Sequence, residues 1–181
     1  FPDDIFVADK SVLETIVGFR MHQGVMAVAN VPPEPELDEL IRSSISPKFF
    51  AALDRLVFAE NVGVIVRNCA AFGVQGVLVG ETSASPYLRR AVRNSMGTVF
   101  HMPVVHTASL PDALTTIRSR HNMSVLVADA HTATSLYDTD YRQDTCIVFG
   151  NEDTGVSSSI MSIATGAVRI PMKEGIDSLN V

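Results

Sequence analysis

Short apolar runs alternate with amphipathic segments along the chain after residue 45. Apolar runs of about 4 to 8 residues that end at Gly, Pro or polar residues are typical of buried strands. They predict strands at about 49–57, 75–80, 99–105, 123–128, 145–149 and 166–170. Apolar positions three and four residues apart predict helices at about 61–73, 86–96, 109–120 and 156–164. Strands that alternate with helices form βαβ units, so we expect an α/β fold with a mostly parallel sheet and helices on both faces.

The first 45 residues follow a different pattern. Ser11 and Glu14 have the spacing of a capping box, which predicts a short helix. The apolar segment 24–30 predicts a buried strand, and the proline-rich sequence VPPEPE that follows predicts a stiff linker. We therefore expect the end of one domain at 1–31, a linker at 32–45 and a second domain at 46–181.

The composition is that of an ordinary globular protein, with 46% hydrophobic and 19% charged residues. The formal net charge of -6 argues against a protein that binds nucleic acid mainly through a large cationic surface. The negative net charge does not exclude a local basic face, for which Arg89, Arg90 and Arg93 are the candidates because they lie close together. A solvated helix face is the alternative. Polar residues interrupt the most apolar stretch, 60–80, so we expect no membrane-spanning segment.

Cys69 and Cys146 lie far apart, without a C-x-x-C motif or a histidine pair at ligand spacing. We expect two buried free thiols in a reducing compartment, and no metal site. The chain opens without a charged and apolar leader, so no secretion signal is predicted. Together these features favour a cytoplasmic protein.

The helix predicted at 61–73 combines an apolar face with polar residues. Asn61 is a favourable N-cap. The apolar face carries Val62, Ile65, Val66, Cys69 and Phe72. Arg67 falls on another side, one turn after Gly63, where a backbone or a ligand can approach closely. A surface arginine and an arginine that acts on a ligand are both consistent with this pattern.

Ligands bind parallel α/β sheets at the carboxyl ends of the strands, and one such end carries a candidate loop. After the strand at 145–149, Gly150 and Gly155 bound a short segment that contains Glu152. We expect a ligand loop whose glutamate holds a hydroxyl or an amine. A solvated glutamate is the alternative.

A second strand end lies at 166–170, where Pro171 prevents the strand from continuing. A loop then leads to Ser178 and Asn180, whose hydroxyl and carboxamide suit either a helix cap or a polar site.

The sequence lacks the motifs of dinucleotide-binding, phosphate-binding, zinc-protease and serine-hydrolase sites. His131 follows Asp129 by two residues. We interpret His131 as a loop histidine rather than as part of a hydrolytic pair.

Taken together, the three stretches resemble the signature motifs of the SpoU/TrmH ribose methyltransferases of the SPOUT class. The first motif, N-x-G-x-I-x-R-x-x-x-x-F-G, is matched over residues 61–73. The second, G-x-E-x-x-G, is matched over 150–155. The third is matched by Ile-Pro-Met at 170–172 and Ser-Leu-Asn at 178–180. The resemblance covers about residues 46–181.

The resemblance implies a C-terminal deep trefoil knot that builds the pocket for S-adenosylmethionine, and a homodimer whose interface helps to form the active site. Segment 17–30 is similar to the end of the small L30e-like substrate-binding domain of many members. The family normally continues into a helix that completes the knot, whereas this sequence stops at Val181. We therefore expect the domain to lack this helix. Many members also have Asp-Pro where this chain has Phe58 and Ala59, which affects the expected loop shape.

Position by position, the resemblance assigns three groups of residues. The polar catalytic set is Asn61, Arg67, Glu152, Ser178 and Asn180. The cofactor-binding set is Ala128, Asp129, Gly150, Asn151, Gly155, Ile170, Met172 and Leu179. The residues expected to contact RNA phosphates are Arg89, Arg90 and Arg93. Arg67 is expected to orient the target ribose 2′-hydroxyl and a neighbouring phosphate rather than to act as a base, because a guanidinium keeps its proton in proteins.

The sequence therefore predicts an S-adenosylmethionine-dependent methyltransferase that modifies a ribose 2′-hydroxyl of rRNA or tRNA. The competing hypothesis is a non-catalytic RNA-binding protein that keeps the fold and the pocket. A domain that binds another nucleotide is disfavoured, because the glycines of a phosphate-binding loop are absent.

Overall fold

The computed structural model describes residues 5–22, 24–173, 175 and 180, and the chain divides into two compact units, Phe1–Val31 and Pro32–Val181. The first unit contains helix α1 (Lys10–Val17), which ends at Gly18 in the left-handed conformation, with φ 75°. The N-cap of α1 is Asp9, and its side chain makes no capping bond. The capping box expected at Ser11 is therefore wrong.

The strand expected at 24–30 is also wrong. These residues have no strand conformation, and Val25 and Val28 are 81% and 93% exposed. A strand needs a neighbouring strand for its backbone N–H and C=O groups, and the described residues of 1–31 include none. Apolar composition alone does not make this segment a strand.

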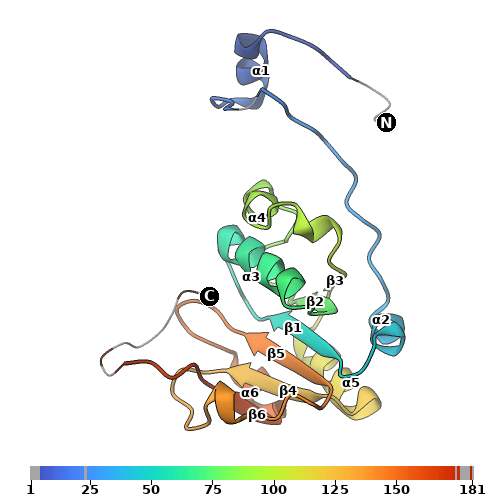
Figure 1. Ribbon diagram of the computed structural model, residues 1–181, viewed down its shortest axis with the longest axis vertical. Coiled ribbons are helices and arrows are strands. Elements are labelled where there is room, and N and C mark those ends of the chain that lie inside the picture. Colours follow the sequence, from blue (N-terminus) through green and yellow to red (C-terminus); the bar gives the residue numbers. More distant parts are fainter. Residues whose placement is uncertain (1–4, 23, 174, 176–179, 181) are drawn as a thin grey trace. The chain divides into compact units, whose positions relative to one another are not determined.

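The second unit is built on a sheet of six strands (Figure 1). The strands are β1 (Phe49–Leu53), β2 (Gly76–Val79), β3 (Val104–His106), β4 (Ser124–Ala128), β5 (Thr145–Phe149) and β6 (Gly166–Val168). Their spatial order is β3-β2-β1-β5-β4-β6, and all paired strands are parallel. The expected parallel sheet is confirmed. Only the end of the segment 99–105 is a strand, because Thr98–Phe100 forms the 3-10 helix η1.

Helices cover both faces of this sheet, as expected (Figure 1). One face carries α2 (Leu37–Ser43), α5 (Leu110–His121) and α6 (Ser158–Ile163), and the other carries α3 (Ala59–Ala71) and α4 (Arg89–Asn94). The cause is the alternation of side chains along each strand. In β1, Phe50 and Ala52 pack into the core on the α5 side, whereas Ala51 and Leu53 pack into the core on the α3 side.

Helix α2 lies inside the segment expected as a linker at 32–45. Its Ile41 is fully buried in the core of the second unit, and Leu37 and Leu40 pack against the same core. The linker expectation is therefore wrong for residues 37–43, where the spacing of apolar residues outweighs the preceding prolines.

Helix α3 begins at Ala59, with Phe58 as its N-cap, rather than at Asn61. Asn61 is therefore not a cap, and its side chain bonds elsewhere. The expected apolar face is confirmed for Val62, Ile65, Val66 and Cys69. Phe72 is 82% exposed, contrary to expectation, and is the C-cap residue that follows the last residue of α3.

Both cysteines are buried free thiols, as expected. Burial raises the pKa of each thiol to about 12. Among the residues that the structure describes, no helix has the length and apolar character needed to cross a membrane. The same residues contain no group of His, Cys, Asp or Glu side chains that could hold a metal ion.

Gly63 is the point where α3 packs directly on the backbone of α4. A Cβ atom at this position would lie 2.3 Å from the carbonyl oxygen of Ala91. We therefore expect Gly63→Ala to lower the free energy of unfolding by about 1–3 kcal/mol, because backbone cannot move away cheaply. Urea unfolding measures the loss.

The matched control is Ala70→Ser, at an exposed position of the same helix, for which we expect a change within about 0.5 kcal/mol. Equal stability of Gly63→Ala and the parent protein would contradict this close packing of α3 on α4.

Candidate functional site

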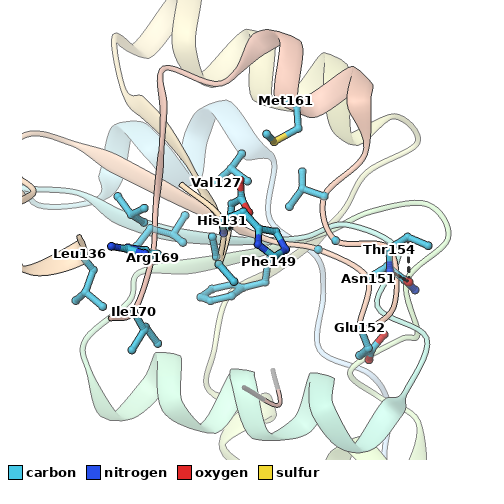
Figure 2. A pocket seen from close by; sticks show the side chains of 18 of the residues that line it. Val127, His131, Leu136, Phe149, Asn151, Glu152, Thr154, Met161, Arg169 and Ile170 are labelled. Atoms are coloured by element: carbon cyan, nitrogen blue, oxygen red, sulfur yellow. Dashed lines mark hydrogen bonds between the residues drawn. The ribbon is translucent and has the colours of Figure 1, made fainter. Parts of the chain in front are cut away.

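A cavity of about 690 Å³ lies at the carboxyl ends of β4, β5 and β6 (Figure 2). It is formed by residues 128–131 after β4, by residues 150–156 after β5, and by Arg169, Ile170 and Met172 after β6. Parallel strands end at the same edge of a sheet, so loops that are far apart in the sequence converge there. The volume is within the range of roughly 300–1,000 Å³ that is typical of small-molecule sites.

The lining combines apolar walls with an acidic edge. Its apolar side chains include Val127, Leu136, Phe149, Met161 and Ile170. Asp129, Glu152 and Asp153 supply carboxylates, and the lining also includes His131 and Arg169. The backbone N–H of His131 donates to Asp129 Oδ1 at 2.9 Å, a local turn that agrees with a loop histidine.

Most of the predicted cofactor-binding residues line this one cavity. They are Ala128, Asp129, Gly150, Asn151, Gly155, Ile170 and Met172. Leu179, the remaining member of that set, lies outside the described residues. Figure 2 shows Asn151, Glu152 and Thr154 at one end of the cavity and Leu136, Arg169 and Ile170 at the other.

The loop after β5 is held in a tight turn. The backbones of Asn151 and Gly155 bond to each other in both directions, at 3.0 and 2.9 Å. Asn151 Oδ1 also accepts hydrogen bonds from the backbone N–H groups of Asp153 and Thr154. A Cβ atom at Gly150 would lie 2.2 Å from the backbone nitrogen of Val156, so glycine is needed there for this close approach.

A chain of hydrogen bonds joins three of the five predicted catalytic residues. Asn61 Nδ2 donates to Glu152 Oε1 at 3.0 Å, and Asn180 Nδ2 donates to Asn61 Oδ1 at 3.2 Å. The backbone N–H of Val57 donates to Glu152 Oε2 at 3.4 Å. Residues from α3, from the loop after β5 and from the end of the chain therefore meet beside the cavity, of which Glu152 and Asn180 form part.

The other two predicted catalytic residues are not brought into this cluster. Ser178 lies outside the described residues. The Arg67 side chain is exposed on α3, does not line the cavity, and forms no hydrogen bond or ion pair within the part of the chain that the structure describes. Residues six apart on a helix differ in direction by about a third of a turn, so Arg67 faces away from Asn61.

The predicted RNA-binding arginines lie on α4. Arg89, Arg90 and Arg93 are all exposed. Arg90 Nη1 forms an ion pair with Glu60 Oε1 at 3.0 Å, which compensates part of the positive charge. Arg90 and Arg93 also line a shallow hollow of about 350 Å³ together with Glu60 and Asn94.

Comparison with known proteins identifies the family. Residues 48–181 match the model of the SpoU rRNA Methylase family. The chain belongs to the SpoU rRNA methylase family. It is 32% identical over 161 residues to a 23S rRNA (uridine(2479)-2'-O)-methyltransferase from Streptomyces viridochromogenes, a match that covers 86% of this chain and 55% of that protein. It is 31% identical over 183 residues to an uncharacterized tRNA/rRNA methyltransferase from Mycobacterium tuberculosis, covering 96% of this chain and 60% of the relative.

Solved SpoU structures share this fold. The crystal structure of the SpoU methyltransferase AviRb from Streptomyces viridochromogenes, in complex with the cofactor AdoMet, superposes with a TM-score of 0.75 and 28% identity. That match covers 82% of this chain and 59% of AviRb. This SpoU chain thus spans more than half, but less than two thirds, of the length of these relatives.

Sequence reasoning missed Asp54 and Arg55, two residues next to the loop that carries Glu152. They follow β1 directly and contact the loop after β5. The available signal was a charged pair at the end of an entirely apolar strand, which places ionic groups at the same sheet edge as the motif residues.

Asn61 is the central member of the hydrogen-bonded chain, and its substitution tests the geometry of this SpoU site. We expect Asn61→Ala to lower the free energy of unfolding by about 1–2 kcal/mol, because Glu152 and Asn180 both lose a partner. Asn61→Asp should cost more, because it also sets a second carboxylate against Glu152. Urea unfolding at pH 7 compares the variants.

Asn68→Ala is the matched control, since Asn68 is an exposed asparagine on the same helix. We expect its stability to change by less than about 0.5 kcal/mol. The hydrogen-bonded chain would be refuted by an Asn61→Asp variant that is as stable as the Asn68→Ala variant.

Proposed function

We propose that this SpoU protein transfers a methyl group from S-adenosylmethionine to a ribose 2′-hydroxyl of rRNA or tRNA. One observation carries the proposal: the loops after β4, β5 and β6 enclose a single cavity, and the bonded set of Glu152, Asn61 and Asn180 lies at its edge. The similarity to a 23S rRNA 2'-O-methyltransferase and to a SpoU structure with AdoMet supports the same chemistry here.

The lining of the cavity fits S-adenosylmethionine. The flat purine of this molecule suits apolar walls such as Phe149 and Leu136. Its sulfur and amino group are positively charged, which suits the carboxylates of Asp129, Glu152 and Asp153. A nucleotide phosphate would meet the same carboxylates and be repelled. These three carboxylates therefore favour a cationic ligand over a phosphorylated one.

Backbone groups at the strand ends are the proposed cofactor contacts. They come from residues 128–129 after β4, Gly150 and Asn151 after β5, and Ile170 to Met172 after β6, with Leu179 as the last member of the set. Gly155 contributes by closing the loop after β5. Three separate loops would thus hold the cofactor without a dedicated phosphate-binding motif.

When bound, S-adenosylmethionine supplies a methyl group attached to a positively charged sulfur. Transfer forms a bond from the ribose oxygen to the methyl carbon, breaks the bond from sulfur to carbon, and releases the hydroxyl proton. The protein must aim the hydroxyl and stabilise the developing negative charge on its oxygen.

The polar cluster beside the cavity is suited to that task. Each carboxamide NH2 has two N–H donors. Asn61 and Asn180 can therefore hold Glu152 and each other while each donates a second hydrogen bond to a substrate oxygen. Glu152 accepts from Asn61 and from the backbone of Val57, which fixes its carboxylate for a substrate hydroxyl or amine. Ser178 completes the proposed set.

Arg67 is proposed to orient the ribose hydroxyl and a neighbouring phosphate. A guanidinium can hold both groups and favour a developing alkoxide without losing its own proton. Arg67 faces away from Asn61 on α3, and this direction supports a homodimer in which the arginine of one copy serves the cavity of the other. The homodimer is part of the proposal.

The finer features of the fold belong to the same proposal. The hydrogen bond between Asn180 and Asn61 brings the end of the chain back to α3 after β6, which supports a C-terminal trefoil knot of the SPOUT type. An L30e-like domain ending near residue 31 and a cytoplasmic location are proposed with it.

The exposed arginines of α4 are proposed to contact RNA phosphates. The chain has a net charge of -6, so binding would rest on this local face and on the shape of the RNA rather than on overall charge. We accordingly propose weak binding to unrelated RNA.

Methyl transfer by the full-length protein tests this function. The protein is incubated with labelled S-adenosylmethionine and total RNA, and 2′-O-methyl marks are mapped. We expect a mark at a defined nucleotide. Cofactor binding without transfer to any RNA would instead support a non-catalytic RNA-binding protein, and the absence of both would overturn the proposal.

Arg67→Ala tests the role of the arginine. We expect the transfer rate to fall by about 10²–10³-fold, because one stabilising cation is lost at the developing charge, while S-adenosylmethionine still binds. Arg120→Ala, an exposed arginine on α5 that pairs with Asp38 at 3.4 Å, is the control. Transfer by Arg67→Ala at the parental rate would remove Arg67 from the site.

A further inference from the structure

The turn after β1 is an unusual piece of backbone beside the site. Arg55 has φ 58°, in the left-handed region that residues with a side chain seldom adopt. Backbone in such a conformation persists only where the surrounding contacts hold it. On one side, Ser83 supplies such contacts: its hydroxyl donates to the Leu53 carbonyl at 2.9 Å and accepts from the Leu56 N–H at 3.1 Å.

On its other side, the same turn is bonded to the loop after β5. Asp54 Oδ2 accepts from the backbone N–H of Ser157 at 2.7 Å, and Arg55 Nη2 donates to the carbonyl of Gly155 at 3.1 Å. The Arg55 carbonyl accepts from Asn151 Nδ2 at 2.9 Å. Three hydrogen bonds thus connect the turn to both ends of the loop that carries Glu152.

The two side chains also form a pair. Arg55 Nε lies 3.5 Å from Asp54 Oδ1, and the Asp54 side chain is 8% exposed. A carboxylate this deeply buried needs partners for its charge. The Ser157 N–H and the guanidinium are those partners, so each side chain stabilises the position of the other.

We infer that Asp54 and Arg55 are positioning residues that brace the 150–157 loop, and thereby set both the cavity wall and the carboxylate of Glu152. The inference concerns their effect on the proposed methyltransferase site and in that respect rests on the proposed function. Neither residue is placed against the reacting atoms: neither lines the cavity, and both act through Gly155, Ser157 and Asn151.

Hydrogen exchange tests the brace without reference to activity. In the full-length protein, Arg55→Ala should speed exchange of the amides in segment 150–157 by about three- to tenfold, the change expected from the loss of one hydrogen bond. Arg55→Lys, which keeps the cation, should restore part of the protection. Arg118→Ala is the matched control, because Arg118 Nη1 donates to the Ile163 carbonyl at 2.7 Å, outside segment 150–157. Unchanged exchange in 150–157 for Arg55→Ala would overturn the inference.

Asp54→Asn tests the other half of the pair. It keeps an acceptor for the Ser157 N–H but removes the charge, so we expect faster exchange in the same segment. The double variant with Arg55→Ala should lose little more than either single variant, because the two act as a unit. Additive losses would contradict a shared brace. If Asp54→Asn does not fold, the Arg55 variants alone decide.

Ligand binding then separates the inference from the proposed function. We expect Arg55→Ala to weaken binding of S-adenosylmethionine by about three- to tenfold. A parent protein that does not bind S-adenosylmethionine would refute the proposed function, while the exchange result would still decide on the brace. Parental affinity for S-adenosylmethionine in Arg55→Ala, together with faster exchange, would show that the brace does not set the cavity wall.

Discussion

The parallel pairing of β1 with β5 is the constraint on which the site depends. Its register runs from Phe49 opposite Thr145 to Leu53 opposite Phe149, so both strands end at the same level. The turn after β1 and the loop after β5 therefore leave the sheet side by side. Asp54 and Arg55 bond to that loop directly, and α3 follows from the turn with Asn61 in reach of Glu152.

Much of the fold follows from local pattern. Six apolar strands and the helices between them can be recognised because burial on two faces leaves continuous apolar runs in the strands and periodic ones in the helices. The wrong predictions of secondary structure have a different cause. The segment 24–30 is as apolar as a strand but has no partner strand among the described residues of its unit, and α2 follows prolines that suggest a linker. Both outcomes depend on tertiary contacts that a local window does not contain.

The candidate site could be predicted in its residues more fully than in its geometry. Predicted cofactor-binding residues from three loops converge on one cavity. However, the sequence predicts Asn61 as a helix cap. In the structure α3 starts at Ala59 instead, and the Asn61 side chain contacts Glu152. The role of Arg55 could not be predicted from the sequence. Its bond to Gly155 joins positions 100 apart, and local sequence does not reveal its left-handed backbone.

A crystal structure of the full-length protein with S-adenosylhomocysteine, the product left after methyl transfer, tests the proposed cofactor site. We expect the ligand to lie between the loops at 128–131 and 150–156 and the residues after β6, with its sulfur facing the cluster of Asn61, Glu152 and Asn180. A ligand bound at another surface, or one with its sulfur turned away from that cluster, would contradict the proposed site.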